Sequence, residues 1–399
     1  MMEAAQFRRE LTGNILPFWM RHTVDREDGG FYGAVTCDLK VVKEAPRAAV
    51  INARILWTFS AAYRLLGNPE YREMADRAYA YILDKFWDKE YGGVYWMVDY
   101  RGHPISERKQ IYAQAFAIYG LSEYYRATGK TESLERAQQL FRLIEEKSRE
   151  AVYGGYLEAC SRDWGALDDL RLSEKDLNSP KSMNTHLHVM EAYTNLLRVW
   201  RDPSLVAAQK ALLEVTLDHI VDGASGHFRM FFDNQWNSLT DHISFGHDIE
   251  GSWLLCEAAE ALGDAALFER VRGLALRMAG VALSEGLDAA GGLCYEGKDG
   301  KIVDGGGEWW PQSEAVVGFL NAFQLSGDPR FLHAAHRVWD FIESRLVDRA
   351  HGEWFWRINP DGRPAADLPK VSEWKGPYHG GRACLEAMRR LGQIKSTPT

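Results

Sequence analysis

The sequence predicts an all-α protein, a closed (α/α)6 barrel of twelve helices with short β-ribbons in the loops at one end. Three observations lead to this prediction. A glycine and aromatic motif recurs six times along the 399 residues, helical patterns lie between the copies at two per unit, and no series of long strand patterns interrupts them. An open solenoid built from the same units is the structural alternative.

Each copy of the motif places one or two glycines before aromatic and β-branched residues, as in EDGGFYGAV and EYGGVYWMV. The first glycines recur at intervals of 61 to 72 residues, at Gly29, Gly92, Gly154, Gly226, Gly291 and Gly352. A period of this size indicates six similar units. Because glycine adopts positive φ at little cost, each copy is expected to form a tight turn that leads into a short β-ribbon.

Between these copies, apolar residues spaced at i, i+3, i+4 and i+7 predict two helices per unit. Glycines such as Gly67, Gly129 and Gly327 are expected to end helices as C-caps. The even-numbered helices are rich in small and apolar residues and should form the inner ring, with their N-terminal ends around one open mouth. The predicted helices cover residues 3–20, 51–65, 71–87, 109–127, 132–147, 185–200, 204–220, 246–262, 266–285, 308–325, 330–346 and 378–392.

The length of 399 residues allows two or three ordinary domains or one large barrel, and composition does not decide between them. With the six repeats, we predict a single barrel domain over residues 1–394 and a C-terminal tail over residues 395–399. A net charge of -9 without a basic stripe argues against nucleic acid as a partner. The five cysteines are widely spaced and form no CxxC pair, which suits a reducing compartment. Because no signal peptide or membrane-spanning pattern is present, we expect a cytoplasmic protein without a membrane partner, either a monomer or a homodimer.

Polar and aromatic residues gather at the start of the even-numbered helices, which predicts that six distant segments meet in one cavity. They are Asn52, Arg54, Lys109, Tyr112, Asn184, His186, His188, Glu191, His247, Asp248, Glu250, Trp253, Trp309, Trp310, Glu314, Trp374, His379 and Arg382. Taken singly, each has a simpler interpretation. His247 and Glu250 could form a surface pair, and the two tryptophans before Pro311 could be core residues, although a proline in the first helical turn favours the mouth.

A zinc site is the rival interpretation of His186 and His188. An i, i+2 spacing is poor for two ligands on one helix, and neither an HExxH motif, clustered carboxylates nor cysteine partners accompany the pair. We therefore predict no metal.

Four long segments, MNTHLHVMEAYTNL, GHDIEGSWLL, EWWPQSEAVVGF and EWKGPYHGGRACLE, closely resemble the cellobiose 2-epimerases, a branch of the N-acylglucosamine 2-epimerase superfamily. The resemblance extends over nearly the whole chain and agrees with the (α/α)6 prediction. It implies a metal-independent, cofactor-free epimerase that interconverts glucose and mannose at the reducing end of β-1,4-linked disaccharides.

The resemblance also implies roles for individual residues. His247 and His379 correspond to the family's two acid/base histidines, His188 to its third pocket histidine, and Arg54 to the arginine near the sugar. The expected substrate-binding residues are Tyr112, Asn184, Glu250, Trp253, Trp310, Glu314 and Trp374. One departure concerns Gly380, where the family commonly has asparagine in PYHNGR; the loss of that side chain could alter a sugar subsite.

Histidine suits a 2-epimerase because its ordinary pKa of about 6.5 allows it to accept or donate a proton near neutrality. We expect His247 and His379 to exchange the proton at carbon 2, while Arg54 and His188 hold the negative charge that develops on the oxygen at carbon 1. Inversion would follow from two opposed histidines, or from bond rotation in the enediolate.

Three rival functions remain open from the sequence. An epimerase or aldose–ketose isomerase could act on free mannose, glucose or N-acylglucosamine with nearly the same chemistry. Glu250 and Glu314 could instead serve an inverting glycoside hydrolase, which also uses two carboxylates on such barrels. A non-catalytic sugar-binding protein is disfavoured by the concentration of ionisable groups.

Overall fold

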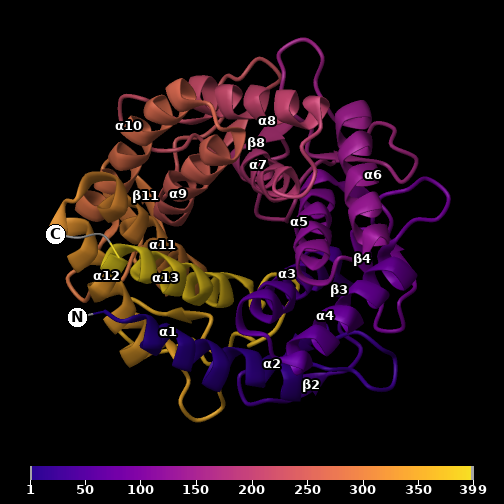
Figure 1. Ribbon diagram of the computed structural model, residues 1–399, viewed down its shortest axis with the longest axis horizontal. Helices are drawn as coiled ribbons and strands as arrows, with labels where there is room; N and C mark the ends of the chain where they lie inside the picture. Colours follow the sequence, from indigo (N-terminus) through magenta and orange to yellow (C-terminus); the bar gives the residue numbers. More distant parts are fainter. Residues whose placement is uncertain (1, 397–399) are drawn as a thin grey trace.

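The computed structural model of the chain describes residues 2–396, with side chains over residues 2–392. Helices in this part of the chain form two concentric rings around a common axis (Figure 1). Successive inner helices pack against each other and the last contacts the first, so the ring is closed and the open solenoid is excluded. The predicted (α/α)6 barrel is confirmed. The inner helices are α3 (Ala49–Leu66), α5 (Ile111–Thr128), α7 (Met183–Leu197), α9 (Phe245–Leu262), α11 (Trp309–Ser326) and α13 (Tyr378–Ser396).

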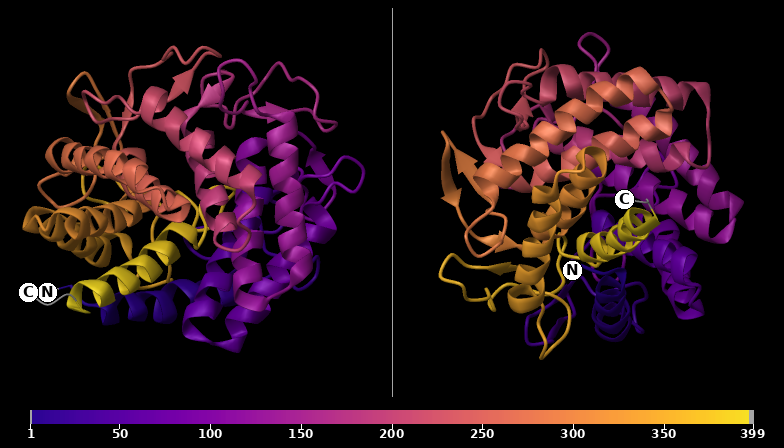
Figure 2. Two further views of the ribbon diagram at one scale, coloured as in Figure 1. Left: turned by 45° about the horizontal axis from the view of Figure 1, so that its top comes forward. Right: turned by 60° about the vertical axis from the view of Figure 1, so that its left-hand side comes forward.

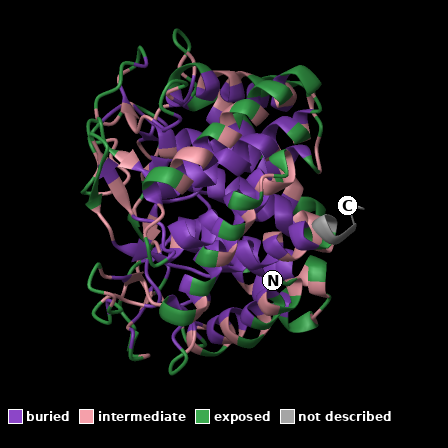
Figure 3. Ribbon diagram, turned by 90° about the vertical axis from the view of Figure 1, so that its left-hand side faces the viewer, coloured by how far each residue is buried: buried purple, intermediate pink, exposed green. Residues whose placement is uncertain are grey.

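The outer ring covers the inner ring and presents one polar face to solvent, whereas the inner helices are buried on most sides (Figure 3). None of the described helices combines the length and hydropathy that a membrane span requires. The outer helices are the rod of α1 (Ala4–Glu10), η1 (Leu11–Ile15) and α2 (Leu16–His22), then α4 (Pro69–Tyr81), α6 (Thr131–Lys147), α8 (Pro203–Val215), α10 (Ala265–Val281) and α12 (Pro329–Phe341). Four of them continue into π-helical turns, η2 (Ile82–Phe86), η3 (Thr216–Ile220), η4 (Ala282–Gly286) and η5 (Ile342–Leu346).

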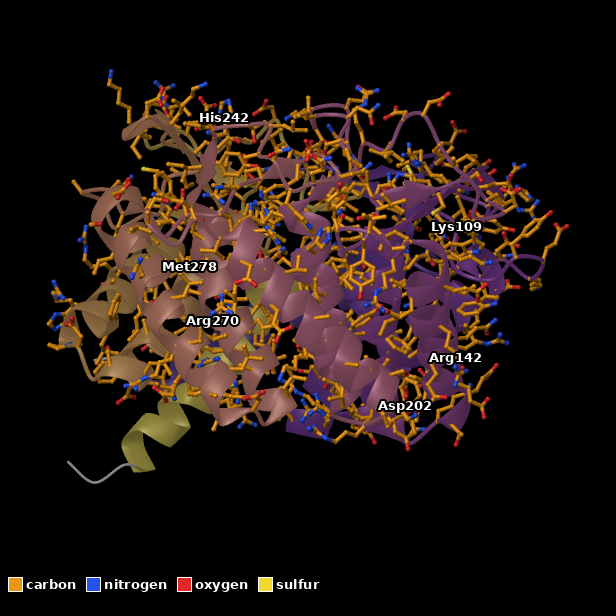
Figure 4. All side chains as sticks on the ribbon, turned by 90° about the horizontal axis from the view of Figure 1, so that it is seen from above. Lys109, Arg142, Asp202, His242, Arg270 and Met278 are labelled. Carbon is orange, nitrogen blue, oxygen red and sulfur yellow. The ribbon has the colours of Figure 1, made fainter. Side chains whose placement is uncertain are left out.

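At one end of the barrel, tight links join each of the first five inner helices to the next outer helix. Gly67, Gly129 and Gly327 end their helices in the left-handed conformation, with φ of 72°, 72° and 71°, as the sequence predicted. The side chains of Asn68 and Asp328 then cap the outer helices that follow. The long connections are therefore left to the opposite end; Figure 4 shows Asp202 at the end with tight links and His242 at the end with long loops.

We call the end with long loops the mouth, because the inner helices begin there. A strand of two residues precedes each of five inner helices and pairs with a strand from the next repeat, so neighbouring repeats are joined (Figure 2). These pairs are β3 (Arg47–Ala48) with β4 (Met97–Val98), β6 (Lys109–Gln110) with β7 (Ala159–Cys160), β8 (Lys181–Ser182) with β9 (Phe231–Phe232), β10 (Ile243–Ser244) with β11 (Glu296–Lys298), and β13 (Gly307–Glu308) with β14 (Arg357–Ile358). Four more strands are present in the described part of the chain. β1 (Ala34–Val35) and β2 (Val41–Val42) form a separate ribbon, β5 (Pro104–Ser106) pairs with β4, and β12 (Lys301–Asp304) pairs with β11.

Two glycines allow neighbouring inner helices to approach closely. A Cβ atom at Gly120 of α5 would lie 2.7 Å from the carbonyl oxygen of Ala53 on α3, and one at Gly318 of α11 would lie 2.7 Å from that of Ile249 on α9. Any side chain at these positions would push the helices apart. The inner ring is therefore narrow enough for side chains from different helices to meet on its axis.

The structure moves some predicted boundaries. Residues 109–110, predicted as the start of a helix, form strand β6 because they pair with β7. The helix predicted at 185–200 begins at Met183 and ends at Leu197. The last helix extends to Ser396, and residues 397–399 of the predicted tail lie outside the described residues. The division into a domain over 1–394 and a tail over 395–399 stays a prediction.

Candidate active site

Two positions near the start of the inner helices, the fourth and the sixth residue, have the same role in several repeats. In four of them the fourth residue holds a ribbon at the mouth, accepting a hydrogen bond from a backbone N–H; these residues are Gln114, His186, Asp248 and Gln312. Two positions further on, the sixth residue of five inner helices points into the inner ring, where these side chains contact one another or Arg382. These residues are Arg54, Phe116, His188, Glu250 and Glu314. His186 and Asp248 therefore belong to the ribbons, although the sequence grouped them with the cavity.

We use the name axial cluster for the connected side chains at this level: Arg54, Tyr112, Phe116, His188, Glu191, His247, Glu250, Trp253, Trp310, Glu314, Tyr378, His379 and Arg382. They come from all six inner helices. The structure thus brings together nine of the eleven residues to which the family resemblance gives a catalytic or substrate-binding role. The other two are Asn184 and Trp374, and the carbonyl oxygen of Trp374 accepts from Arg54 of the cluster.

Arg382 of α13 lies at the centre of the axial cluster and is fully buried. One of its terminal nitrogens donates to Glu250 Oε1 at 2.6 Å and to Glu314 Oε1 at 2.8 Å. The other donates to Glu191 and to the hydroxyl of Tyr378. One guanidinium therefore faces three carboxyl groups from three helices. Despite its burial, these negative charges raise the pKa of Arg382 well above its usual value, so it is a permanent cation.

The three carboxyl groups are not equivalent. Although burial alone would raise its pKa, the charge of Arg382 and the bond from His188 lower the pKa of Glu191 to about 2. Burial and the negative charge of Glu314 raise the pKa of Glu250 well above its ordinary value. Glu191 is therefore a carboxylate, while the neutral acid is favoured at Glu250.

His379 of α13 pairs with Glu314 of α11. Its Nδ1 donates to Glu314 Oε1 at 2.7 Å, and Trp253 Nε1 donates to the other oxygen of Glu314 at 3.1 Å. Burial raises the pKa of Glu314, and the charge of Arg382 opposes this effect. Because both oxygens of Glu314 face other donors, Arg382 and Trp253, the bond to His379 places the hydrogen on Nδ1 and leaves the lone pair on Nε2. Burial, with the charges of Arg54 and Arg382, lowers the pKa of His379 well below its usual value, so its resting form is a neutral proton acceptor.

His188 of α7 has the same arrangement with Glu191. Its Nδ1 donates to Glu191 Oε2 at 2.8 Å, and its ring packs against Tyr112 at 5.0 Å and Phe116 at 4.8 Å between centroids. Burial lowers the pKa of His188, and Glu191 opposes this effect. The Nε2 atom of His188 is accordingly a second free acceptor, backed by a carboxylate that would stabilise the imidazolium.

Arg54 of α3 is buried, with 4% of its surface exposed, and its partners among residues 2–392 are all uncharged. It donates to the hydroxyl of Tyr112 at 2.9 Å and to the carbonyl oxygen of Trp374 at 3.2 Å, while its Nε has no partner in the described part of the chain. The guanidinium stacks over the Phe116 ring at 4.4 Å. A buried cation without a counter-ion is costly, so this position favours an anionic ligand or an anionic intermediate.

His247 of α9 lies at the mouth side of the cluster and is half-buried. Its Nδ1 lies 2.7 Å from Ser244 Oγ, and its ring contacts Trp310 at 4.7 Å between centroids. The same indole contacts His379 at 5.8 Å. Burial, with the nearby charge of His188, lowers the pKa of His247 to about 3. The two histidines predicted as an acid/base pair therefore contact one tryptophan, although they come from different helices.

The predicted stacking tryptophans differ in their surroundings. Trp310 and Trp374 are half-buried, like His247. Trp253 is 1% exposed, and its ring lies 4.7 Å from the Arg382 guanidinium. Trp253 therefore supports Arg382 and Glu314 from within the core. Asn184 is half-buried at the start of α7. No described residue donates a hydrogen bond to its Oδ1, so this atom can still accept one from a ligand.

Glu250, Glu314 and His379 could in principle hold a metal ion, since one ligand atom from each lies within 4.8 Å of the others. The same Oε1 atoms of the two carboxyl groups already accept hydrogen bonds from Arg382. Arg382 thus supplies the positive charge that a cation would bring, and the donor set fits proton transfer better than metal ligation.

Several residues of the cluster received no role from the sequence. Glu191 was noted only as a polar residue, yet its i+3 spacing from His188 on one helix is a signal that could have identified the pair. Arg382 is likewise predicted only as a polar residue near the mouth, and the sequence gives no sign of a role for Tyr378 and Phe116 of the cluster or for Ser244 beside it. Lys109 was grouped with the cavity but pairs with Asp88 under a ribbon at 2.8 Å, and both side chains are fully buried there.

Gly380 does not face the cluster. A Cβ atom at this position would point at Ile15 Cδ1, 3.3 Å away, and at the Trp354 ring, 3.7 Å away, both in the layer between α13 and the outer ring. The expectation that the missing asparagine alters a sugar subsite is not supported by this geometry, because the side chain would extend away from the axis.

Comparison with known proteins agrees with the resemblance noted in the sequence. The sequence profile of the family described as N-acylglucosamine 2-epimerase (GlcNAc 2-epimerase) matches residues 30–379. The chain is 49% identical over 384 residues to a cellobiose 2-epimerase of Bacteroides fragilis, covering 96% of this chain and 98% of that protein. It is 42% identical to a cellobiose 2-epimerase of Dictyoglomus turgidum, with 96% and 97% covered. The solved structure of cellobiose 2-epimerase from Bacillus thermoamylovorans superposes with a TM-score of 0.92 at 41% identity, covering 97% of this chain and 99% of that one.

Proposed function

The chain belongs to the N-acylglucosamine 2-epimerase family, and from this premise we propose that it acts as a cellobiose 2-epimerase. It would invert carbon 2 of the reducing-end sugar of a β-1,4-linked disaccharide, between the glucose and mannose configurations. Support comes from relatives of that name that match along nearly their full length. It also comes from the axial cluster, which holds three histidines, paired carboxyl groups and an arginine with no ion-pair partner among residues 2–392.

The observation that carries the proposal is that the buried guanidinium of Arg54 has no ion-pair partner among residues 2–392. When carbon 2 of an open-chain aldose loses its proton, the electron pair of the C–H bond forms a double bond to carbon 1, and negative charge moves to the oxygen there. A buried guanidinium with only uncharged partners would bind that enediolate more strongly than the neutral sugar. Preferential binding of the intermediate lowers the barrier to proton removal.

His379 and His247 would exchange the proton at carbon 2. His379 offers a free Nε2 lone pair because Glu314 holds its Nδ1, and His247 contacts the same indole, that of Trp310. One imidazole removes the proton, and the other returns a proton to the opposite face, or the intermediate rotates to present its second face. Trp310, which contacts both rings, and Trp374, whose carbonyl oxygen accepts from Arg54, are partly exposed and would stack on the sugar.

His188 would act first, during ring opening. Its neutral form cannot donate from Nε2 while Nδ1 is bonded to Glu191, so it would accept the proton of the hydroxyl on carbon 1. The O–H electron pair then forms the aldehyde C=O, the bond from carbon 1 to the ring oxygen breaks, and that oxygen takes a proton from solvent. The imidazolium of His188, paired with Glu191, would then share with Arg54 in holding the charge on the oxygen of carbon 1.

The experiment is product analysis by NMR in D2O, with cellobiose, mannobiose, lactose, mannose and N-acetylglucosamine as substrates. We expect the C2 epimer of a disaccharide, with deuterium at carbon 2. Release of glucose from cellobiose would indicate a glycoside hydrolase. Turnover of only monosaccharides would indicate an epimerase or aldose–ketose isomerase that acts on free sugars. H247A and H379A should each lose activity by about 10²-fold to 10⁴-fold while remaining folded; near-normal turnover in either variant would refute the assignment.

A further inference from the structure

Two serines occupy the same place in successive repeats but use their hydroxyl groups differently. Ser182 ends strand β8 and is the N-cap of α7, and Ser244 ends strand β10 and is the N-cap of α9. The hydroxyl of Ser182 accepts a hydrogen bond at 3.1 Å from the backbone N–H of Thr185, three residues on, which is the usual role of a capping serine. The hydroxyl of Ser244 makes no such cap and lies 2.7 Å from the side chain of His247, also three residues on.

This hydroxyl is the one hydrogen-bond partner of the His247 ring among residues 2–392. The ring is held on one side by Ser244 and on another by Trp310, at 4.7 Å between centroids. With Nδ1 engaged by Ser244, Nε2 is the nitrogen left free to meet a ligand. Ser244 itself is 7% exposed, so water does not readily replace its hydroxyl.

The partner of His247 differs in kind from those of the other two histidines. His188 and His379 are each bonded to a carboxylate, which only accepts and therefore fixes the hydrogen on Nδ1. A hydroxyl can donate or accept. When Nε2 takes up and releases the proton, Nδ1 carries a hydrogen in both the neutral base and the imidazolium. The hydroxyl of Ser244 can therefore accept from Nδ1 in both states, without a change in the position of the ring.

We propose that Ser244 is a positioning residue for His247, whose hydroxyl keeps Nε2 directed at the reacting carbon in every protonation state that a proton-exchanging histidine passes through. Ser244 transfers no proton to the sugar and touches no reacting atom. The inference rests on the proposed function, because the orientation of His247 matters to turnover only if His247 exchanges a proton with substrate. It explains why the first turn of α9 lacks the serine cap that α7 has.

The chain offers a matched control for the test. In S244A we expect kcat and the rate of deuterium uptake at carbon 2 to fall on the order of 10-fold to 100-fold, with KM changed less than about threefold, because a misdirected base slows the chemical step. S244T retains a hydroxyl and should recover most of the lost kcat. S182A removes the hydrogen bond that caps α7 and should therefore lower the melting temperature more than S244A does. Its kcat should stay near that of the wild type.

A readout on the ring itself separates positioning from general damage. Two-bond ¹H–¹⁵N spectra of histidine-labelled protein, with H247N used to assign the signals, should show the His247 nitrogens shifted in S244A and unchanged in S182A. Wild-type kcat in S244A, or a loss that merely follows the melting temperature and is not restored by S244T, would overturn the proposal. Should the wild type incorporate no deuterium into any sugar, the proposed function fails, whereas the His247 spectra still decide whether Ser244 holds the ring.

Discussion

Glu314 and His379 are joined by a hydrogen bond of 2.7 Å between Oε1 and Nδ1, although 65 residues separate them in the chain. The carboxylate also accepts from Arg382 and from Trp253, so it has little freedom to move. This bond determines which nitrogen of His379 is free. The carboxylate that His379 needs is therefore supplied by α11 and not by α13, the helix that carries the histidine.

E314Q should therefore lower kcat by about 10²-fold to 10⁴-fold with a much smaller effect on KM, since an amide no longer fixes the hydrogen on Nδ1. Steady-state kinetics and deuterium exchange at carbon 2 measure this. E257Q is the matched control, because Glu257 also pairs with arginines, Arg198 and Arg389, but does not contact the axial cluster. A wild-type kcat in E314Q would show that the bond has no catalytic role.

Chelation should leave epimerisation unchanged. Arg382 donates to the carboxyl oxygens of Glu250 and Glu314 that would otherwise serve a cation, at 2.6 and 2.8 Å. Activity measured after dialysis against EDTA, and again after addition of Mg²⁺, Mn²⁺ or Zn²⁺, should agree within experimental error. A loss on dialysis that one metal restores would assign Glu250, Glu314 and His379 as ligands instead.

K109M should lower the free energy of unfolding by about 3 kcal/mol, because it leaves the buried carboxylate of Asp88 without its lysine. Arg162, 3.1 Å from the same carboxylate, limits the loss. Urea unfolding measures the change. The kcat at 25 °C should stay within about twofold of the wild type, since Lys109 lies outside the axial cluster. A collapse of kcat without loss of stability would return Lys109 to the active site.

G380A should change neither the ratio of disaccharide to monosaccharide turnover nor KM for cellobiose. The added methyl group would face Ile15 and Trp354 rather than the barrel axis. Its effect on stability should be within about 1 kcal/mol, where the helical preference for alanine and the 3.3 Å contact with Ile15 oppose each other. Competition between cellobiose and mannose tests the point; a changed preference would place position 380 in a subsite.

His227 should stabilise the fold in a pH-dependent way. Burial opposes its protonation, but the bond to Asp248 at 2.7 Å and the charge of Glu285 raise its pKa above 6.5. Its stabilising effect is therefore complete below pH 6.5 and is lost as the pH rises through the folded-state pKa. A tenfold difference in proton affinity between the folded and unfolded states corresponds to about 1.4 kcal/mol. The difference in unfolding free energy between wild type and H227N should shrink from pH 6 to pH 9, and a constant difference would show that His227 stays neutral.

The sequence was sufficient for the barrel, because the period of the glycine motif and the two helices per unit depend on local spacing. It was also sufficient to place Arg54, His188, Glu250 and Glu314 at one level, since each lies near the start of an inner helix. Whether a polar side chain there turns to the axis or to a ribbon depends on its position within the helical turn. The sequence could not resolve that difference of two residues, and this is why His186 and His188 were grouped together.

Partners across the barrel were not predictable. Glu191 meets Tyr378 and Arg382 only because α7 and α13 face each other across the axis, and pairing over about 190 residues leaves no trace in local spacing. The sequence predicts short ribbons at the mouth but not which strands pair in them, and five strand pairs join consecutive repeats.

The closure of the ring by α13 has a consequence for biosynthesis. This helix packs between α11 and α3 beside α1, and it carries both His379 and the guanidinium that faces Glu191, Glu250 and Glu314 (Figure 1). The ribosome releases α13 after all the other inner helices, so until then a nascent chain holds three facing carboxyl groups without their cation. A chain that ended before Tyr378 would therefore lack His379 and the cation that faces the three carboxyl groups, and its inner ring would have no helix between α11 and α3.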